Sequence, residues 1–173
     1  MALSLFNKSP KVARPGAVPQ PSTVKPFANE KTLFKIDLTQ NVAQLPDFPD
    51  KTLTNIRYPL IMPYAFAHIY WDKETNELAY DIEEPVLNDE EKKIFKLLED
   101  GIREIINISL INVKDPAVVI EYLEKNLKVL ISEFKIKVAE DSFLKVMYYI
   151  YRNFVGMNEI DPMLNDYFIE DIE

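Results

Sequence analysis

His68 is the side chain best suited to catalysis or metal binding near neutral pH, and it is the single histidine of the chain. Any Ser–His or His–metal arrangement must therefore use it. Strand alternation places His68 on one face with Phe66 and Tyr70, and no carboxylate stands at strand spacing to orient its ring. We expect a structural histidine beside aromatic side chains, and a catalytic histidine is the alternative.

A run of acidic residues is the second candidate for a chemical site. Its members are Glu83, Glu84, Asp89, Glu90 and Glu91. Carboxylates at this density could hold a metal ion or serve as acid and base. Three of them open a predicted helix, where negative charge complements the helix dipole. We therefore expect a solvated helix start here, with a metal site as the alternative.

The glycines exclude the common nucleotide-binding loops. A P-loop needs a glycine-rich turn that ends in Lys followed by Ser or Thr, and a dinucleotide-binding loop needs GxGxxG. The glycines of this chain, Gly16, Gly101 and Gly156, stand far apart and precede Ala, Ile and Met. We predict that this chain contains no catalytic residue, cofactor site or metal site, and that it does not hydrolyse ATP.

Charge and composition indicate a folded protein that does not bind nucleic acid. A chain of 173 residues with 47% hydrophobic content can bury a sizeable core. The net charge of -8 provides no basic face that could release phosphate counterions. The absence of cysteine suits a reducing compartment, and no segment has the pattern of a signal peptide or a transmembrane helix. We expect a cytoplasmic protein.

The first 31 residues differ from the rest of the chain in charge and composition. They contain five basic residues and one acidic residue, a net of +4, which leaves -12 for the remainder. They also contain five prolines and too few apolar residues to offset the entropy of ordering. We predict a disordered, basic, Pro-rich arm at 1–31. It is either a tether for anionic lipid or an acidic partner, or an ordinary disordered leader.

Residues 32–87 are predicted to form a small antiparallel β-sheet. The stretch LFKIDLT at 33–39 alternates apolar and polar residues, which is typical of a half-buried strand. A second strand is expected at 65–71, after prolines that exclude a helix. A third strand in LAYDIEE at 78–84 would complete a hairpin, with Asn76 in a left-handed turn position.

Residues 88–156 are predicted to form a three-helix bundle. The first helix begins at Asn88 with a capping box, the second begins at Asp115 before a proline, and the third spans 141–154 and stops before Gly156. Their predicted apolar stripes are Ile94, Leu97, Leu98, Ile102, Ile105 and Ile106; Ile120, Leu123, Leu127, Leu130, Ile131 and Phe134; and Phe143, Val146, Met147, Ile150 and Phe154. The predicted fold class is α+β, with the sheet followed by the bundle.

Aromatic residues gather in two regions of the chain and suggest a possible partner surface. Tyr148 and Tyr149 lie beside the predicted buried stripe of the third helix, and Trp71 ends the second expected strand. Aromatic rings are enriched at protein interfaces as well as in cores. Core packing of these rings is the expected interpretation, with an exposed interface patch as the alternative.

Residues 157–173 are predicted to form a stiff connector to a further domain. Pro162 fixes a backbone dihedral, and Ile160 and Leu164 could anchor a short turn. Asp161 could cap that turn by accepting from the N–H groups that follow it. A connector of this kind would pass on rigid-body motion, whereas the alternative is a simple reversal of the chain.

The segments YPLIMPYAFAHIYWD, LAYDIEEP and YYIYRNFVGMNEIDPMLNDYFIEDI resemble the N-terminal region of archaeal-type type II and type IV secretion and pilus-assembly ATPases. The resemblance runs from roughly Tyr58 to Glu173, and its last segment is the most specific. The matching residues are Arg152, Phe154, Gly156, Ile160, Asp161, Pro162, Asp166, Ile169, Glu170, Asp171 and Ile172, whereas Asn153, Met163, Asn165 and Tyr167 depart from the family pattern.

The resemblance implies that the chain ends where a second domain and an ATPase core would begin. The implied parent is a hexameric secretion ATPase of archaeal type that uses ATP and Mg²⁺ at motifs not present here. Its N-terminal module would contact a polytopic membrane platform protein or neighbouring subunits at the inner face of the cell membrane. The alternative function is a stand-alone acidic adaptor that docks through an aromatic face.

Overall fold

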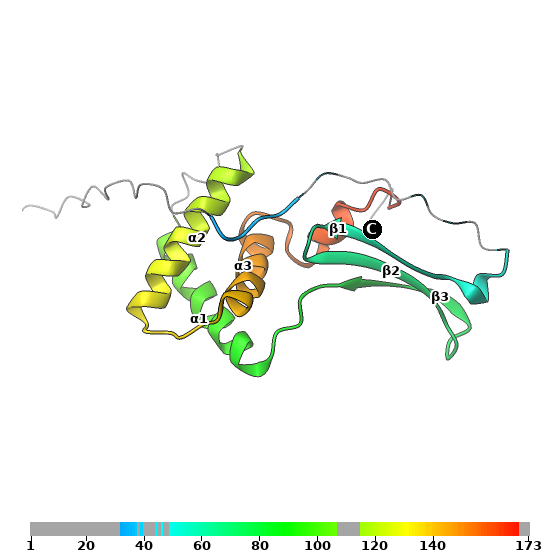
Figure 1. The fold of residues 1–173 in the computed structure, drawn as a ribbon, viewed down its shortest axis with the longest axis horizontal. Helices are drawn as coiled ribbons and strands as arrows, with labels where there is room; N and C mark the ends of the chain where they lie inside the picture. The colour runs from blue at the N-terminus through cyan, green and yellow to red at the C-terminus, as the bar shows by residue number, and fades with distance from the viewer. Residues whose placement is uncertain are drawn as a thin grey trace, which may run out of the picture. The chain divides into compact units, whose positions relative to one another are not determined.

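The computed structural model describes residues 32–37, 39, 44, 46, 49–106 and 115–169. These residues belong to one compact unit and form an α+β fold, in which an antiparallel sheet precedes the main helices along the chain (Figure 1). The predicted fold class is therefore confirmed for the part of the chain that the structure describes. The predicted arm at 1–31 lies outside the described residues.

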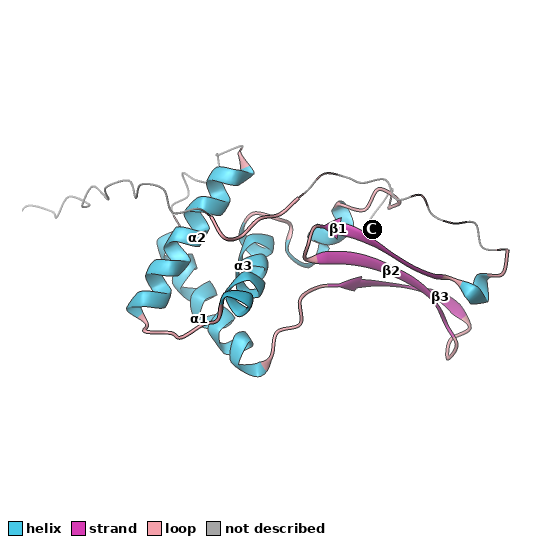
Figure 2. Cartoon of the chain, in the orientation of Figure 1, coloured by secondary structure: helices cyan, strands magenta, loops and turns pink. Residues whose placement is uncertain are grey.

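Three strands form the sheet in the order β1-β2-β3, and both pairs are antiparallel (Figure 2). Their bounds are Asn55–Ile61 for β1, Ala65–Asp72 for β2 and Glu77–Glu83 for β3. Asn76 has a φ of 54° in the turn between β2 and β3, which confirms the predicted hairpin. Register pairs Arg57 with His68 and His68 with Asp81, so these three side chains share one face.

The predicted strand at 33–39 is wrong. Among its described residues, Asp37 forms only an isolated bridge with Met62, and Leu38 lies outside the described residues. Strand β1 occupies the corresponding place in the sheet, although it contains Pro59. Proline is tolerated there because β1 is an edge strand, where one row of N–H groups has no ladder partner.

The backbone N–H groups around Phe34 donate to a helix side chain and not to a neighbouring strand. The N–H groups of Leu33 and Phe34 each donate to a carboxylate oxygen of Glu124 at 2.9 Å. Phe34 is buried and packs against Tyr64 and Tyr151, with ring centroids 5.1 and 6.1 Å apart. A helix side chain thus satisfies donors that a neighbouring strand would otherwise have to satisfy.

The three long helices begin within one residue of where the sequence predicts, whereas the short α4 was not predicted as a helix. The bounds are Asp89–Ile105 for α1, Pro116–Glu133 for α2, Glu140–Phe154 for α3 and Asp161–Leu164 for the short α4, with 3-10 turns η1 at Lys51–Leu53 and η3 at Asn158–Ile160. Asn88 and Glu91 form the predicted capping box of α1. Asp115 caps α2 by accepting from the N–H of Ala117 at 2.9 Å.

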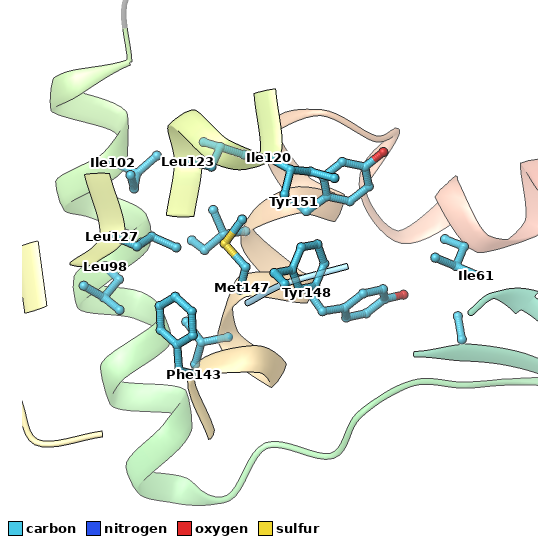
Figure 3. Packing of buried hydrophobic residues seen from close by; sticks show 14 of the residues in the cluster. Ile61, Leu98, Ile102, Ile120, Leu123, Leu127, Phe143, Met147, Tyr148 and Tyr151 are labelled. Carbon is cyan, nitrogen blue, oxygen red and sulfur yellow. The ribbon is translucent and has the colours of Figure 1, made fainter. Parts of the chain in front are cut away.

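One hydrophobic core joins the sheet to the three long helices. Figure 3 shows side chains of α1, α2 and α3 packed together, with Ile61 of β1 on the side of Tyr148 and Tyr151. The labelled members of the cluster are Ile61, Leu98, Ile102, Ile120, Leu123, Leu127, Phe143, Met147, Tyr148 and Tyr151. Three predicted stripe residues are not part of this core, because Leu97, Ile105 and Phe134 are 46%, 39% and 45% exposed. A residue adjacent to a buried one points about 100° away from it on a helix, so Leu97 faces outward beside buried Leu98.

Helices α1 and α2 approach each other closely at Gly101. A Cβ atom at this position would lie 3.0 Å from a methyl carbon of Leu130. The glycine therefore leaves room for the Leu130 side chain at the helix contact.

Candidate functional site

Arg152 and Glu84 form the centre of the candidate site, which we call the junction. Arg152 comes from α3 and is 8% exposed, and Glu84 follows β3 directly. The Nη1 atom of Arg152 lies 2.8 and 2.7 Å from the two carboxylate oxygens of Glu84. The guanidinium also lies over the ring of Tyr149, 4.8 Å from its centroid. This ion pair ties the end of the sheet to the third helix.

Two tyrosines of α3 complete this part of the junction. The hydroxyl of Tyr148 donates to Glu84 at 2.5 Å, and the hydroxyl of Tyr149 donates to the carbonyl of Pro85 at 2.7 Å. Burial raises the pKa of both phenols above the ordinary value, and the nearby charge of Glu84 adds to this shift. Both hydroxyls therefore remain protonated donors at neutral pH.

The alternative interpretation, an exposed partner surface, is wrong for Tyr148. Its side chain is fully buried at 0% exposure and stacks on Tyr64, with ring centroids 5.3 Å apart. Tyr149 and Trp71 are each half-buried. Core packing, the expected interpretation, describes Tyr148, because its ring packs between the sheet and the bundle.

Asp161 holds the turn that follows α3. Its Oδ1 accepts from the N–H of Met157 at 3.0 Å, and its side chain lies against Gly156, where an added Cβ would come within 2.5 Å of the Asp161 Cγ. The predicted cap is thus wrong in direction, because Asp161 binds an N–H that precedes it. Burial raises the pKa of Asp161, while the Met157 N–H and the charge of Arg152 oppose that shift.

Asp166 attaches the C-terminal part of the described chain to the sheet. Its Oδ2 accepts from the hydroxyls of Tyr58 in β1 and Tyr80 in β3, both at 2.7 Å, and its Oδ1 accepts from the N–H of Phe168 at 2.9 Å. Asp166 is 4% exposed. Burial, followed by the bond to Asp166, raises the pKa of both tyrosines. One carboxylate thereby bridges the two edge strands.

The remaining connector residues divide into buried and exposed positions. Pro162 is buried, and Phe154 is half-buried with the Arg103 guanidinium 5.2 Å from its ring centroid. Ile160 and Leu164 are 41% and 48% exposed, so the prediction that they anchor the turn is wrong. Polar contacts of Asp161 and Asp166 anchor it instead. Asp171 lies outside the described residues.

His68 lies on the outer face of the sheet, away from the junction. It shares this face with Phe66 and Tyr70, as predicted. Its Nε2 lies 2.8 Å from Oδ1 of Asn55, and its Nδ1 lies 3.3 Å from Glu83. No carboxylate stands at strand spacing on β2 itself, as predicted, but the neighbouring strand β3 brings Glu83 to the ring.

The expected solvated helix start is confirmed for Asp89 and Glu90, which are exposed in the first turn of α1, and is wrong for Glu91. Glu91 is 4% exposed and accepts from the hydroxyl of Ser142 at 2.7 Å, with the Lys145 ammonium at 3.3 Å. Its pKa is lowered, first by the N–H of Asn88 and then by Ser142. Among the described residues, no three histidine, aspartate or glutamate side chains are grouped so as to hold a metal ion.

The junction uses its polar groups for attachment. Within the described part of the chain, no buried side-chain nitrogen or oxygen lacks a hydrogen-bond partner. The partners Glu84, Tyr58 and Tyr80 were not predicted from the sequence, because no local pattern marks a residue whose partner lies 64 to 108 positions away. Alternation alone indicates that Tyr58 and Tyr80 stand on an inner strand face.

Comparison with known proteins reveals a distant relative. No protein-family model matches the chain. The chain is 24% identical over 104 residues to an uncharacterized protein of Methanocaldococcus jannaschii, and the match covers 60% of this chain and 41% of the relative. The chain thus spans about two fifths of the length of the relative it matches. In the part of the chain that the structure describes, no helix has the length and apolar character needed to cross a membrane.

Proposed function

We propose that this chain is the non-catalytic N-terminal module of an archaeal-type secretion or pilus-assembly ATPase. In this role it contacts a polytopic membrane platform protein or neighbouring subunits of a hexamer and passes on the motion of the motor domains. Its place is then at the inner face of the cell membrane. ATP and Mg²⁺ would be bound by other parts of the parent protein.

One observation carries the proposal. Among the residues of the family resemblance, Arg152 attaches α3 to Glu84, Asp166 attaches residues 157–169 to the sheet, and Asp161 holds the turn between them. The resemblance therefore coincides with a set of buried, long-range contacts rather than with an exposed loop. A motif of this kind is consistent with a mechanical role for the segment that bears it.

The geometry of the junction suits the transmission of motion. Arg152 binds Glu84 at the end of β3, and Asp166 binds tyrosines of both edge strands, so the segment between them is held at two points. A segment held in this way moves with the sheet and helices as a rigid body. A flexible Gly/Ser linker in its place would absorb the displacement.

The coding sequence after codon 173 is the first test of the proposal. We expect it to encode a Gly-x-x-x-x-Gly-Lys-Ser/Thr box, which forms the phosphate-binding loop of an ATPase. A stop codon, or a long continuation without that box, would contradict the proposal. An immediate stop codon would instead favour the stand-alone acidic adaptor.

Co-purification tests the proposed partner directly. The chain is co-expressed with the polytopic platform protein encoded in the same genome, and the membrane fraction is solubilised in a mild detergent. We expect the platform protein to retain the wild-type chain, whereas Asp166→Ala, which releases the connector from the sheet, lowers the retained amount. Glu90→Gln, on the exposed start of α1, is the matched control and should be retained like the wild type.

A further inference from the structure

The outer face of the sheet carries aromatic rings in a row, flanked by carboxylates. Strand β2 contributes Phe66, His68 and Tyr70 to this face, at alternate positions. By register, its acidic members are Asp72 of β2 and Glu77, Asp81 and Glu83 of β3, and Arg57 is its one Lys or Arg among the described strand residues. The opposite face bears Tyr58 and Tyr80 and meets the junction, so the outer face is separate from it.

Arg57 shows how a cation sits on this face. Its guanidinium lies over the ring of Phe66, 3.6 Å from the centroid, and its Nε pairs with Glu83 at 2.5 Å. A single guanidinium thus satisfies both a ring face and a carboxylate of the neighbouring strand. The chain supplies this cation from β1 itself.

A second combination of ring and carboxylates lies further along β2, at Tyr70. The Tyr70 hydroxyl donates to Asp81 at 2.8 Å, and His68 stacks beside the ring with centroids 4.8 Å apart. Asp72 is opposite Glu77 in the register, and Glu77 is exposed. In the described residues, no cation lies over the Tyr70 ring as Arg57 lies over Phe66.

We propose that this face, centred on Tyr70, binds an extended arginine-containing segment of another protein. The charge of this face favours a cationic ligand, since the face bears four carboxylates and one guanidinium. Arginine fits better than lysine because its planar guanidinium can stack on a ring and bind a carboxylate at the same time. Phe66, which Arg57 already covers, and Tyr70 are four residues apart on one strand, about 13 Å, so the two rings can hold separate guanidinium groups.

The proposal excludes nucleic acid as the ligand of this face. Aromatic rings on a sheet can stack bases, but such platforms also need basic side chains for the phosphates. Here the flanking residues Asp72, Glu77, Asp81 and Glu83 would repel phosphate. The inference does not depend on the proposed function, because it concerns a different face of the sheet.

A peptide titration tests the proposal. The ¹⁵N-labelled full chain is titrated with acetyl-Arg-Thr-Arg-Thr-Arg-Thr-amide in low salt, and the amide shifts are followed by NMR. The controls are the same peptide with Gln or Lys in place of Arg, and a single-stranded RNA oligonucleotide. We expect saturable shifts on β2 and β3 with the Arg peptide, binding about 3-fold weaker with Lys, and none with Gln or RNA.

Variants of this face distinguish binding at the Tyr70 site from non-specific attraction of the peptide to the acidic surface. Tyr70→Leu should weaken binding about 5-fold, whereas Tyr70→Phe, which keeps the ring, should not. Arg57→Gln should tighten binding, because it removes the internal cation and frees Phe66 and Glu83. Glu77→Gln should weaken binding, whereas Glu90→Gln, the same charge change on α1, should leave it unchanged.

Several results would overturn the inference. They are shifts spread evenly over all acidic surfaces, equal losses in Glu77→Gln and Glu90→Gln, or binding of RNA in place of the peptide. Glu77 is exposed at a strand end, so its variant tests the proposal even if Tyr70→Leu fails to fold.

Discussion

The guanidinium of Arg152 bridges both carboxylate oxygens of Glu84, 68 residues earlier in the chain, at 2.8 and 2.7 Å. This contact joins the end of β3 to α3 across the junction. Arg152 is buried and Glu84 is half-buried. The Tyr148 hydroxyl donates to the same carboxylate of Glu84. Its strength follows from this partial exclusion of water, since an exposed pair would contribute little.

Removing one member of this pair should destabilise the fold. Glu84→Ala leaves a buried guanidinium without a counter-charge and unpairs the Tyr148 hydroxyl, so we expect a loss of about 3 kcal/mol in the free energy of unfolding. Urea denaturation followed by circular dichroism measures it. The double variant Glu84→Gln/Arg152→Met should lose less than the sum of its two single variants. Additive losses would show that the two residues do not interact.

Asp166→Ala should release the segment after α4 from the sheet. The change removes an acceptor shared by Tyr58, Tyr80 and the N–H of Phe168, and bonds to a charged acceptor contribute about 1.5–3 kcal/mol. We expect faster amide hydrogen exchange at Phe168 and a loss of about 3 kcal/mol in stability. Tyr80→Phe, which removes one of these bonds, should lose about 1 kcal/mol. Unchanged exchange in Asp166→Ala would contradict this account.

Tyr58 and Tyr80 should ionise only well above the usual range for tyrosine. Burial and then the bond to Asp166 raise their pKa in the folded state above the ordinary 10.0. Because the folded pKa is raised, the resulting stability is fully present below pH 10 and is lost as the pH rises toward the folded pKa. Absorbance at 295 nm should reveal tyrosines that titrate only as the protein unfolds. In Asp166→Asn, both should titrate at lower pH.

Gly156→Ala should be destabilising through contact with a carboxylate. The added Cβ would lie 2.5–2.6 Å from three side-chain atoms of Asp161, which is itself held by the N–H of Met157. Overpacking of this kind typically costs about 1–3 kcal/mol. The double variant Gly156→Ala/Asp161→Gly removes the clashing atoms and should show a smaller additional loss than Gly156→Ala in the wild type. Thermal unfolding of the four proteins checks this cycle.

Asp161→Asn should change the pH dependence of stability. Burial raises the folded pKa of Asp161 above the ordinary 3.8. Its contribution is therefore fully present below pH 3.8 and is lost as the pH rises through the folded pKa. Asparagine keeps an oxygen for the Met157 N–H and does not ionise. The stability of Asp161→Asn relative to the wild type should consequently rise between pH 3.5 and pH 7 in urea titrations, and a flat difference would contradict the shift.

The starts of the helices and the hairpin could be predicted from the sequence because their causes are local. Asn88 and Glu91 satisfy backbone donors within three residues, and Asp115 does the same for α2. Asn76 adopts the left-handed conformation that its side chain tolerates. Most residues of the predicted apolar stripes are buried. The exceptions are at the edges of the stripes, where moving by one position along the helix changes a side chain from buried to exposed.

Long-range pairing could not be predicted in the same way. Phe34 lies in an alternating stretch, but its N–H donates to Glu124, 90 residues away, instead of to a strand. For Tyr148 the sequence left both core packing and an exposed patch open, and contacts with Tyr64 and Glu84 decide in favour of burial. Whether such a residue is paired or buried depends on which distant element packs beside it in the fold.

By itself, the sequence determined the α+β class, the helix starts and the β2–β3 turn, because nearest-neighbour hydrogen bonds and side-chain periodicity specify them. Only the tertiary structure decided that half-buried Glu84 and buried Asp161 and Asp166 act as attachment points and not as solvated charges. The reason is that a carboxylate is costly to bury unless donors converge on it. For Glu84 and Asp166, those donors come from segments far away in the chain.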